Sequence, residues 1–95
     1  MEKFDDIIKS EKPVLVDFFA TWCGPCRRVA PVVDQIAEER AGSVAVYKLD
    51  IDQSRDVAER YNVMSVPTLM VFQNGQVVST AIGARPKSAI EALLP

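Results

Sequence analysis

The sequence contains no histidine, and this absence removes several kinds of catalytic site. Without an imidazole group the chain cannot carry out Cys–His nucleophilic catalysis or Ser–His–Asp hydrolysis, and it lacks an imidazole ligand for a metal. Cysteine is nearly as scarce, with two residues, whereas a structural zinc site takes four cysteine or histidine ligands. A zinc or iron–sulfur centre would therefore need two chains that contribute one cysteine pair each.

A strong charge of one sign and long apolar runs are also lacking. The formal net charge of -2 provides no electrostatic footprint for nucleic acid or for an anionic membrane surface. No apolar run approaches the roughly 20 residues that cross a bilayer, and residues 1–6 lack the apolar segment of a signal peptide. We therefore expect a cytoplasmic protein without nucleic-acid or membrane partners. Disulfides in that compartment are usually transient and catalytic.

The length and the apolar periodicity predict one α/β domain that spans residues 1–95. A near-continuous apolar run at 14–19 is typical of a strand covered on both faces. Helical patterns are expected at 2–10, from Pro25 to a stop at Gly42, at 54–61 and from near Pro86; further strands are expected at 44–50, 68–72 and 77–81.

Two connections determine how these strands should pair. The helix between strands 14–19 and 44–50 makes a β-α-β unit, so these two strands should run parallel. Asn74-Gly75 between two apolar runs is a strong hairpin signal, so the last two strands should be antiparallel. The sequence therefore predicts a mixed four-stranded sheet flanked by helices on both faces.

The two cysteines, Cys23 and Cys26, are three positions apart at the expected start of a helix. A disulfide that closes so short a loop contributes only roughly 2 kcal/mol, against about 4–5 for one that spans most of a domain. Redox chemistry therefore explains the pair better than stapling does. A helix N-terminus favours a thiolate, which predicts Cys23 as the attacking nucleophile and Cys26 as the resolving cysteine.

The stretch from Asp17 to Cys26, with its Trp-Cys-Gly-Pro-Cys core, closely resembles the active-site segment of thioredoxins. The resemblance continues in the same order downstream through Pro31, 48–52, 66–68, 72–75 and Gly83. It implies a thioredoxin-like fold and a protein disulfide reductase that is re-reduced by a thioredoxin reductase. The implied redox group is the Cys23–Cys26 disulfide, with no bound cofactor and no metal. Gly24 and Pro25 match the version found in reducing family members, so the pair should donate electrons.

The resemblance also assigns roles to residues that the sequence alone leaves open. From the sequence, Asp17 is either solvated at a strand end or buried with a raised pKa, and Lys48 could be a solvated charge. The resemblance implies that Asp17 accepts the proton of Cys26 and that Lys48 lies beside Asp17. It implies a cis bond before Pro67, a backbone at Val66 that pairs with extended substrate, and an apolar docking patch of Trp22, Gly24, Pro25, Val66, Pro67, Ile82, Gly83 and Ala84.

Two departures from the family pattern stand out. The sequence begins at the first helix, without the strand that usually precedes it, so strand 44–50 should lie at the sheet edge. We expect a monomer, with a weak edge-to-edge dimer through that strand as the alternative. Phe19 replaces a tryptophan common in bacterial members. Two other functions stay open: a binding or assembly module with the same fold, and a reductase dedicated to one partner system.

Overall fold

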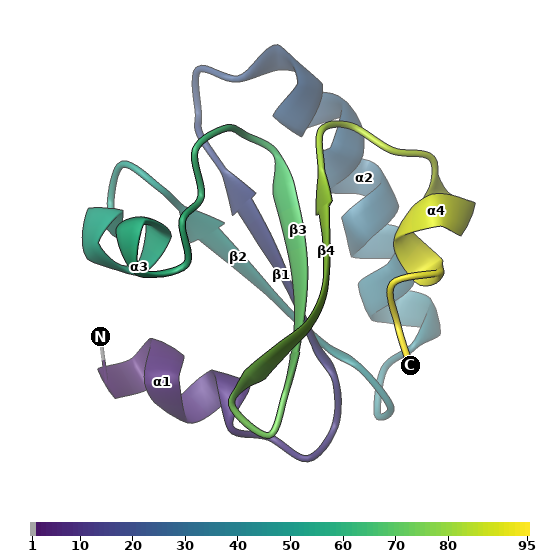
Figure 1. Cartoon of the computed structure of the whole chain (residues 1–95). Coiled ribbons are helices and arrows are strands. Elements are labelled where there is room, and N and C mark those ends of the chain that lie inside the picture. The colour runs from purple at the N-terminus through teal and green to yellow at the C-terminus, as the bar shows by residue number, and fades with distance from the viewer. Residues whose placement is uncertain (1) are drawn as a thin grey trace.

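The computed structural model describes residues 2–95, in which four strands and four helices alternate along most of the chain (Figure 1). The elements are α1 Glu2–Ile8, β1 Val14–Phe19, α2 Gly24–Glu39, β2 Ala45–Asp50, α3 Arg55–Arg60, β3 Thr68–Gln73, β4 Gln76–Ile82 and α4 Lys87–Glu91. The predicted elements are therefore all present, with ends that differ by a few residues.

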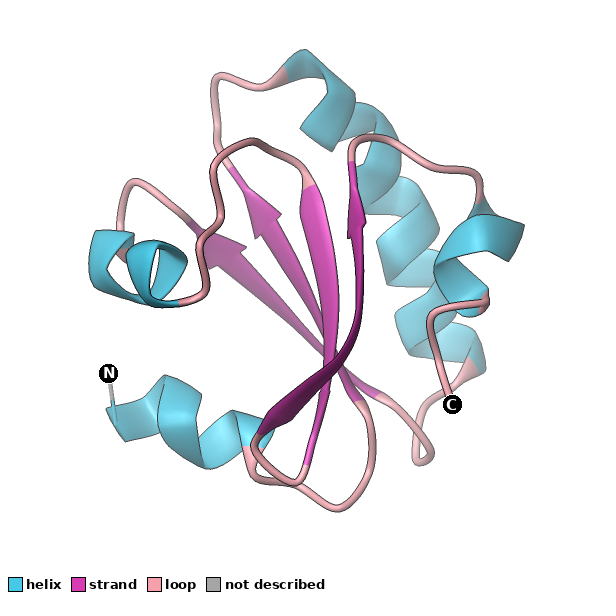
Figure 2. Cartoon of the chain, viewed as in Figure 1, coloured by secondary structure: helices cyan, strands magenta, loops and turns pink. Residues whose placement is uncertain are grey.

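The strands form one mixed sheet in the order β2-β1-β3-β4. Strand β1 runs parallel to β2 and antiparallel to β3, and β3 runs antiparallel to β4. The helices α1 and α3 cover one face of the sheet, and α2 and α4 cover the other (Figure 2). The predicted fold class, a mixed four-stranded sheet between two helical layers, is confirmed.

Strand β1 is buried on both faces, which explains its near-continuous apolar sequence. Val14, Val16 and Phe18 pack into the core beneath α1 and α3, whereas Leu15 packs into the core beneath α2 and α4. Because side chains alternate along a strand, Asp17 falls on the α2 side together with Leu15. The one carboxylate of β1 is thereby carried into the interior below the first turn of α2.

The turns follow the expected chemistry, with one correction. Asn74 (φ 56°) and Gly75 (φ 82°) both adopt left-handed backbone in the β3–β4 hairpin, and Asn62 does so after α3. The prediction that α2 continues to Gly42 is wrong, because the helix ends at Glu39 and Arg40 caps it. Gly42 instead takes its positive φ of 92° in the turn that leads into β2.

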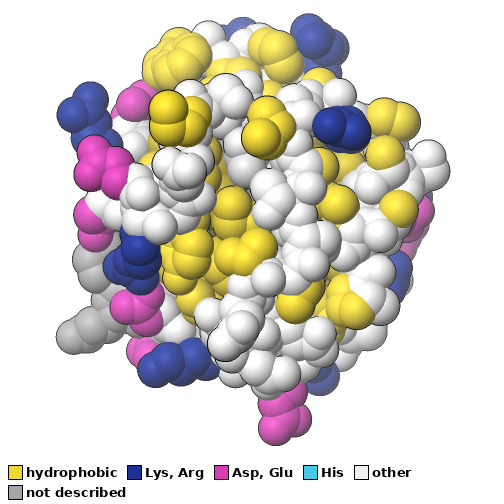
Figure 3. Space-filling view, viewed as in Figure 1, with side chains coloured by type: hydrophobic (Ala, Val, Ile, Leu, Met, Phe, Trp, Pro, Cys, Tyr) yellow, Lys and Arg dark blue, Asp and Glu magenta, His cyan; other side chains and the backbone are white. Residues whose placement is uncertain are grey.

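Three loops gather at one end of the sheet, because the C-terminal ends of β1 and β4 flank the N-terminal end of β3. Figure 1 shows the β1–α2, α3–β3 and β4–α4 connections meeting there, and Figure 3 shows hydrophobic side chains exposed along this end. Within residues 2–95, no helix combines the length and the apolar character that a membrane span requires.

Candidate redox site

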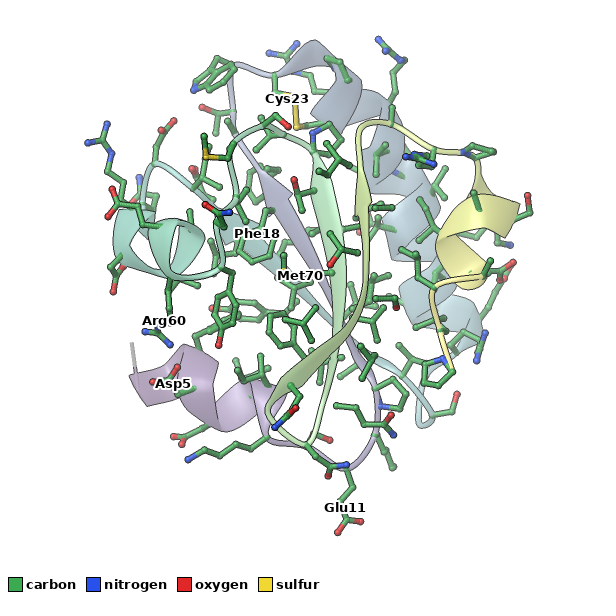
Figure 4. The ribbon with its side chains drawn as sticks, in the orientation of Figure 1. Asp5, Glu11, Phe18, Cys23, Arg60 and Met70 are labelled. Carbon is green, nitrogen blue, oxygen red and sulfur yellow. A yellow bond between two sulfur atoms is a disulfide. The ribbon has the colours of Figure 1, made fainter. Side chains whose placement is uncertain are left out.

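The cysteine pair lies where β1 passes into α2, at the end of the sheet where the three loops meet (Figure 4). Cys23 is the N-cap residue of α2, and Cys26 lies in its first turn. A disulfide joins their sulfur atoms across a Cα–Cα distance of 5.3 Å. Both residues are almost buried, with exposed fractions of 4% for Cys23 and 5% for Cys26.

The start of α2 favours negative charge on Cys23. The backbone N–H of Cys26 donates a hydrogen bond to Cys23 Sγ over 3.1 Å, so the sulfur takes the position of an N-cap acceptor. The first turn contains no acidic residue and is followed by Arg27 and Arg28. A thiolate at this position would receive the same N–H donor and the positive end of a 16-residue helix.

The loop before β3 approaches the same sulfur from the other side. The Val66–Pro67 peptide bond is cis, as predicted, and the Val66 carbonyl oxygen lies 3.7 Å from Cys23 Sγ. The N–H of Gly83 donates to the Pro67 carbonyl over 2.8 Å, which ties the end of β4 to this loop. The Pro67 ring is fully buried. Pro67 therefore shapes the backbone beside the cysteines, while its side chain adds nothing to the exposed surface.

Trp22 is exposed beside the cysteines and does not belong to the core. Its side chain is 66% exposed, and its indole N–H donates to Asp52 Oδ2 over 2.9 Å. Ile82, another predicted patch residue, is 58% exposed. Sequence reasoning missed Asp52, which orients the indole, and Met64, which at 87% is the most exposed large apolar residue in the described part of the chain. The position of Met64 two residues before Val66 was the available signal.

Asp17 is buried below the cysteine pair, with an exposed fraction of 2%. It lines a pocket of about 320 Å³ whose other walls include Cys26 and the exposed residues Thr21 and Arg27. Burial raises the pKa of Asp17 from its ordinary value of 3.8 to about 6, against the opposing attraction of Lys48. The structure thus selects the buried alternative for Asp17, and the pocket connects this carboxyl group and the resolving cysteine with the surface.

Lys48 is the neighbour of Asp17 in the sheet, since the two residues are Cα partners in the β1–β2 register. Its ammonium group, however, pairs with Asp34 of α2, at 2.5 Å between Nζ and Oδ1. The sequence does not predict this ion pair, because nothing in it links positions 34 and 48. In the described part of the chain, no group of three His, Cys, Asp or Glu side chains could hold a metal ion.

Comparison with known proteins assigns the chain to a family, because the sequence model described as Thioredoxin matches residues 1–95. The chain belongs to the thioredoxin family. It is 55% identical over 85 residues to a thioredoxin of Streptomyces clavuligerus, a match that covers 90% of this chain and 78% of the relative.

A solved structure and a fusion protein extend the comparison. A mutant thioredoxin from Halobacterium salinarum superposes with a TM-score of 0.90 at 37% identity, covering 99% of this chain and 81% of that one. A bifunctional thioredoxin reductase/thioredoxin of Mycobacterium leprae is 49% identical over 87 residues, covering 92% of this chain and 19% of the fusion.

Membership in the thioredoxin family defines the activity class. Thioredoxins are disulfide oxidoreductases that work through a redox-active cysteine pair and carry no bound cofactor. The pair of this chain, Cys23 and Cys26, forms such a disulfide at the start of α2. The chain is therefore a thioredoxin-type protein disulfide reductase, and the predicted family, fold and reaction are confirmed.

Proposed function

We propose that Cys23 is the nucleophile and Cys26 the resolving cysteine of a reductase with many protein disulfides as substrates. The Cys23 thiolate attacks one sulfur of the substrate disulfide, and the other substrate sulfur leaves as a thiolate. Cys26, once deprotonated, attacks Cys23 Sγ and releases the second substrate thiolate. The substrate gains two electrons, and the protein is left with the Cys23–Cys26 disulfide. The observation that carries this assignment is the Cys26 N–H donor at Cys23 Sγ.

Asp17 is the proton acceptor for Cys26 in this proposal. The two side chains line the same pocket, and a carboxyl group with a pKa of about 6 is mostly ionised at neutral pH yet more basic than an ordinary aspartate. Water in the pocket can carry the proton between them and out past Thr21 and Arg27. Lys48 modulates Asp17 from the neighbouring strand.

Substrate is proposed to dock as an extended segment against the loop before β3. The Val66 carbonyl lies beside Cys23 Sγ, so a peptide paired with this backbone would present its disulfide to the nucleophile. The exposed Trp22 and Ile82, together with Gly24, Pro25, Gly83 and Ala84, supply an apolar rim, and Met64 extends it. An apolar rim with few fixed polar contacts suits weak docking of many partners.

The oxidised protein must be reduced again before the next turnover, and we assign this step to a thioredoxin reductase. The fusion protein of Mycobacterium leprae, which is named for both activities, supports this partner. A reducing compartment such as the cytoplasm fits the cycle, because the dithiol form has to persist between encounters. We further propose that the protein is a monomer. If two copies associate weakly, they would pair through β2, which lies at the edge of the sheet.

Insulin reduction by dithiothreitol tests the assignment. We expect Cys23→Ser to abolish the acceleration of insulin precipitation, because no nucleophile remains at the helix start. Cys26→Ser should also lose turnover while still forming a mixed disulfide with insulin. A Cys23→Ser protein as active as the wild type would refute the reductase proposal and favour a binding module. Glu59→Gln, on the exposed face of α3, serves as a control in which both cysteines are retained.

A further inference from the structure

Lys48 lies between two carboxylates, Asp17 and Asp34, but its ammonium pairs with only one of them. Asp17 and Lys48 are Cα partners in the parallel register, and both face α2. Lys48 lines the pocket, and its Nζ atom reaches Oδ1 of the exposed Asp34, which is not among the lining residues, at 2.5 Å. Within residues 2–95, Lys48 and Asp17 form no salt bridge, and Asp17 Oδ1 is buried without a hydrogen-bond partner.

The other groups around Asp17 do not supply a cation to it either. Strand β3 contributes Leu69 as the Cα partner of Asp17, and this residue is apolar. From α2, Cys26 and Arg27 line the pocket. The Arg27 guanidinium donates through Nη2 to the Thr21 carbonyl over 3.0 Å, which holds it at the exposed mouth. Both cations that line the pocket are thus held by acceptors other than Asp17.

We propose that Asp34 is a positioning residue for the resolving step. By pairing with the Lys48 ammonium, Asp34 leaves Asp17 without an ion-pair partner and so keeps it a stronger base toward Cys26. The proposal rests on the function proposed above, in which Asp17 accepts the Cys26 proton. Asp34 itself touches neither cysteine in this scheme and acts through Lys48.

The charge of Asp34 acts on Asp17 in two ways that have the same sign. The negative charge of Asp34 raises the pKa of Asp17 directly. The positive charge of Lys48 lowers the pKa of Asp17, and the ion pair with Asp34 holds the Lys48 ammonium group away from Asp17, which again keeps that pKa high. Asp34→Asn removes the repulsion and also frees Lys48 to turn toward Asp17. Because the pair is partly exposed, with 38% and 63% of the two side chains accessible, water screens both effects. We expect a fall of roughly half a unit in the pKa of Asp17.

The direct test is a carbon-13 NMR titration of the Asp17 carboxyl group in the oxidised protein. Asp34→Asn should lower its pKa by roughly half a unit, while Asp34→Glu, which restores the charge, should return it to the wild-type value. Glu38→Gln is the matched control, because it removes an equal charge from the same helix one turn further along. In a Lys48→Gln background the effect of Asp34→Asn should shrink, since no ammonium is left to release.

A kinetic readout connects this shift to the reaction. The reduced protein is mixed with a small aromatic disulfide, and release of the second aromatic thiol reports the resolving step. In Asp34→Asn the acid limb of the pH–rate profile for this release should move to lower pH by as much as the pKa of Asp17 falls. The plateau rate of the release should fall by about twofold, because Asp17 is then a weaker base. A purely structural role for Asp34 would change thermal stability without moving this limb.

Two results would overturn the proposal: an unchanged Asp17 titration in Asp34→Asn, or an equal shift in Glu38→Gln. Failure of the underlying function looks different. If Asp17→Asn resolves the mixed disulfide at the wild-type rate, Asp17 is not the base, even where Asp34→Asn still shifts its titration. If Asp17→Asn is slow but Asp34→Asn leaves the Asp17 titration unmoved, only the role of Asp34 fails.

Discussion

At Asp17 the fold keeps a carboxyl group away from bulk water, and burial of this group lowers the free energy of unfolding at neutral pH. The side chain is 2% exposed and its Oδ1 atom has no hydrogen-bond partner among residues 2–95. Burial raises its pKa from 3.8 to about 6, so the free energy of unfolding falls as the pH rises between these values and stays lower above them. The proposed proton transfer from Cys26 explains why a carboxyl group that destabilises the fold is present at this position.

Asp17→Asn should stabilise the oxidised protein at pH 8. The folded pKa of about 6 exceeds the ordinary 3.8, so between these values the folded state binds more protons than the unfolded state, and stability falls as pH rises. The full shift corresponds to about 3 kcal/mol. The gain should be largest above pH 7 and vanish below about pH 4, as measured by urea unfolding.

The control for this comparison is Glu59→Gln, which removes an exposed carboxylate from α3. It should leave the pH dependence of unfolding close to that of the wild type. A stability difference between Asp17→Asn and wild type that stays constant from pH 4 to pH 8 would contradict the buried, raised-pKa carboxyl group described here.

At the scale of elements, the β3–β4 hairpin has a sharp requirement at its turn. Gly75 has a φ of 82°, where a Cβ atom is strained whatever space surrounds it. Gly75→Ala should therefore lower the free energy of unfolding by about 1 kcal/mol, measured by urea denaturation. Gly24→Ala is the matched control, because Gly24 begins α2 and an added Cβ there meets nothing within 4 Å. Equal destabilisation by the two substitutions would contradict this account of the hairpin.

The sequence was sufficient to predict the elements, because each has a local signal. Asn74-Gly75 predicts the hairpin, and the apolar run of β1 predicts a strand buried on both faces. The end of α2 is the exception, because Gly42 predicts a stop three residues beyond Glu39, the last residue of the helix. Glycine with positive φ serves a turn as well as a helix end, so the residue alone does not distinguish the two.

Contacts between distant side chains could not be predicted in the same way. Asp34 lies on an exposed helix face and Lys48 on an edge strand, and either charge alone is typical of a solvated residue. The same holds for Asp52, which meets the Trp22 indole only because the β1–α2 and β2–α3 loops lie together. The family resemblance implies roles for Asp17, Lys48 and Pro67, but it implies none for Asp34 or Asp52.

For the whole molecule, β2 at the sheet edge determines how copies could associate. The N–H groups of Ala45 and Ile51 donate to Pro13 and Phe19 on the β1 side. Alternation along the strand then directs the Tyr47 and Leu49 amides toward β1 and the Val46 and Lys48 amides outward. In a dilute monomer we expect slow hydrogen exchange at Tyr47 and Leu49 and fast exchange at Val46 and Lys48.

Concentration dependence separates the monomer from an edge-to-edge dimer. If protection of the Val46 and Lys48 amides rises with protein concentration, together with the sedimentation coefficient, copies pair through β2. Protection that stays low at all concentrations fits the monomer. High protection of these two amides in a dilute, monodisperse monomer would contradict the position of β2 as an open edge.

Mass spectrometry of trapped intermediates can show whether Cys23 attacks and Cys26 resolves. A reduced Cys26→Ser protein is mixed with disulfide-containing proteins from a cell extract, and the cross-linked peptides are identified. We predict mixed disulfides at Cys23, with many partners, because Cys23 lies at the helix start and no resolving thiol remains. A Cys23→Ser protein that traps as many partners through Cys26, or a Cys26→Ser protein that traps none, would contradict the assignment.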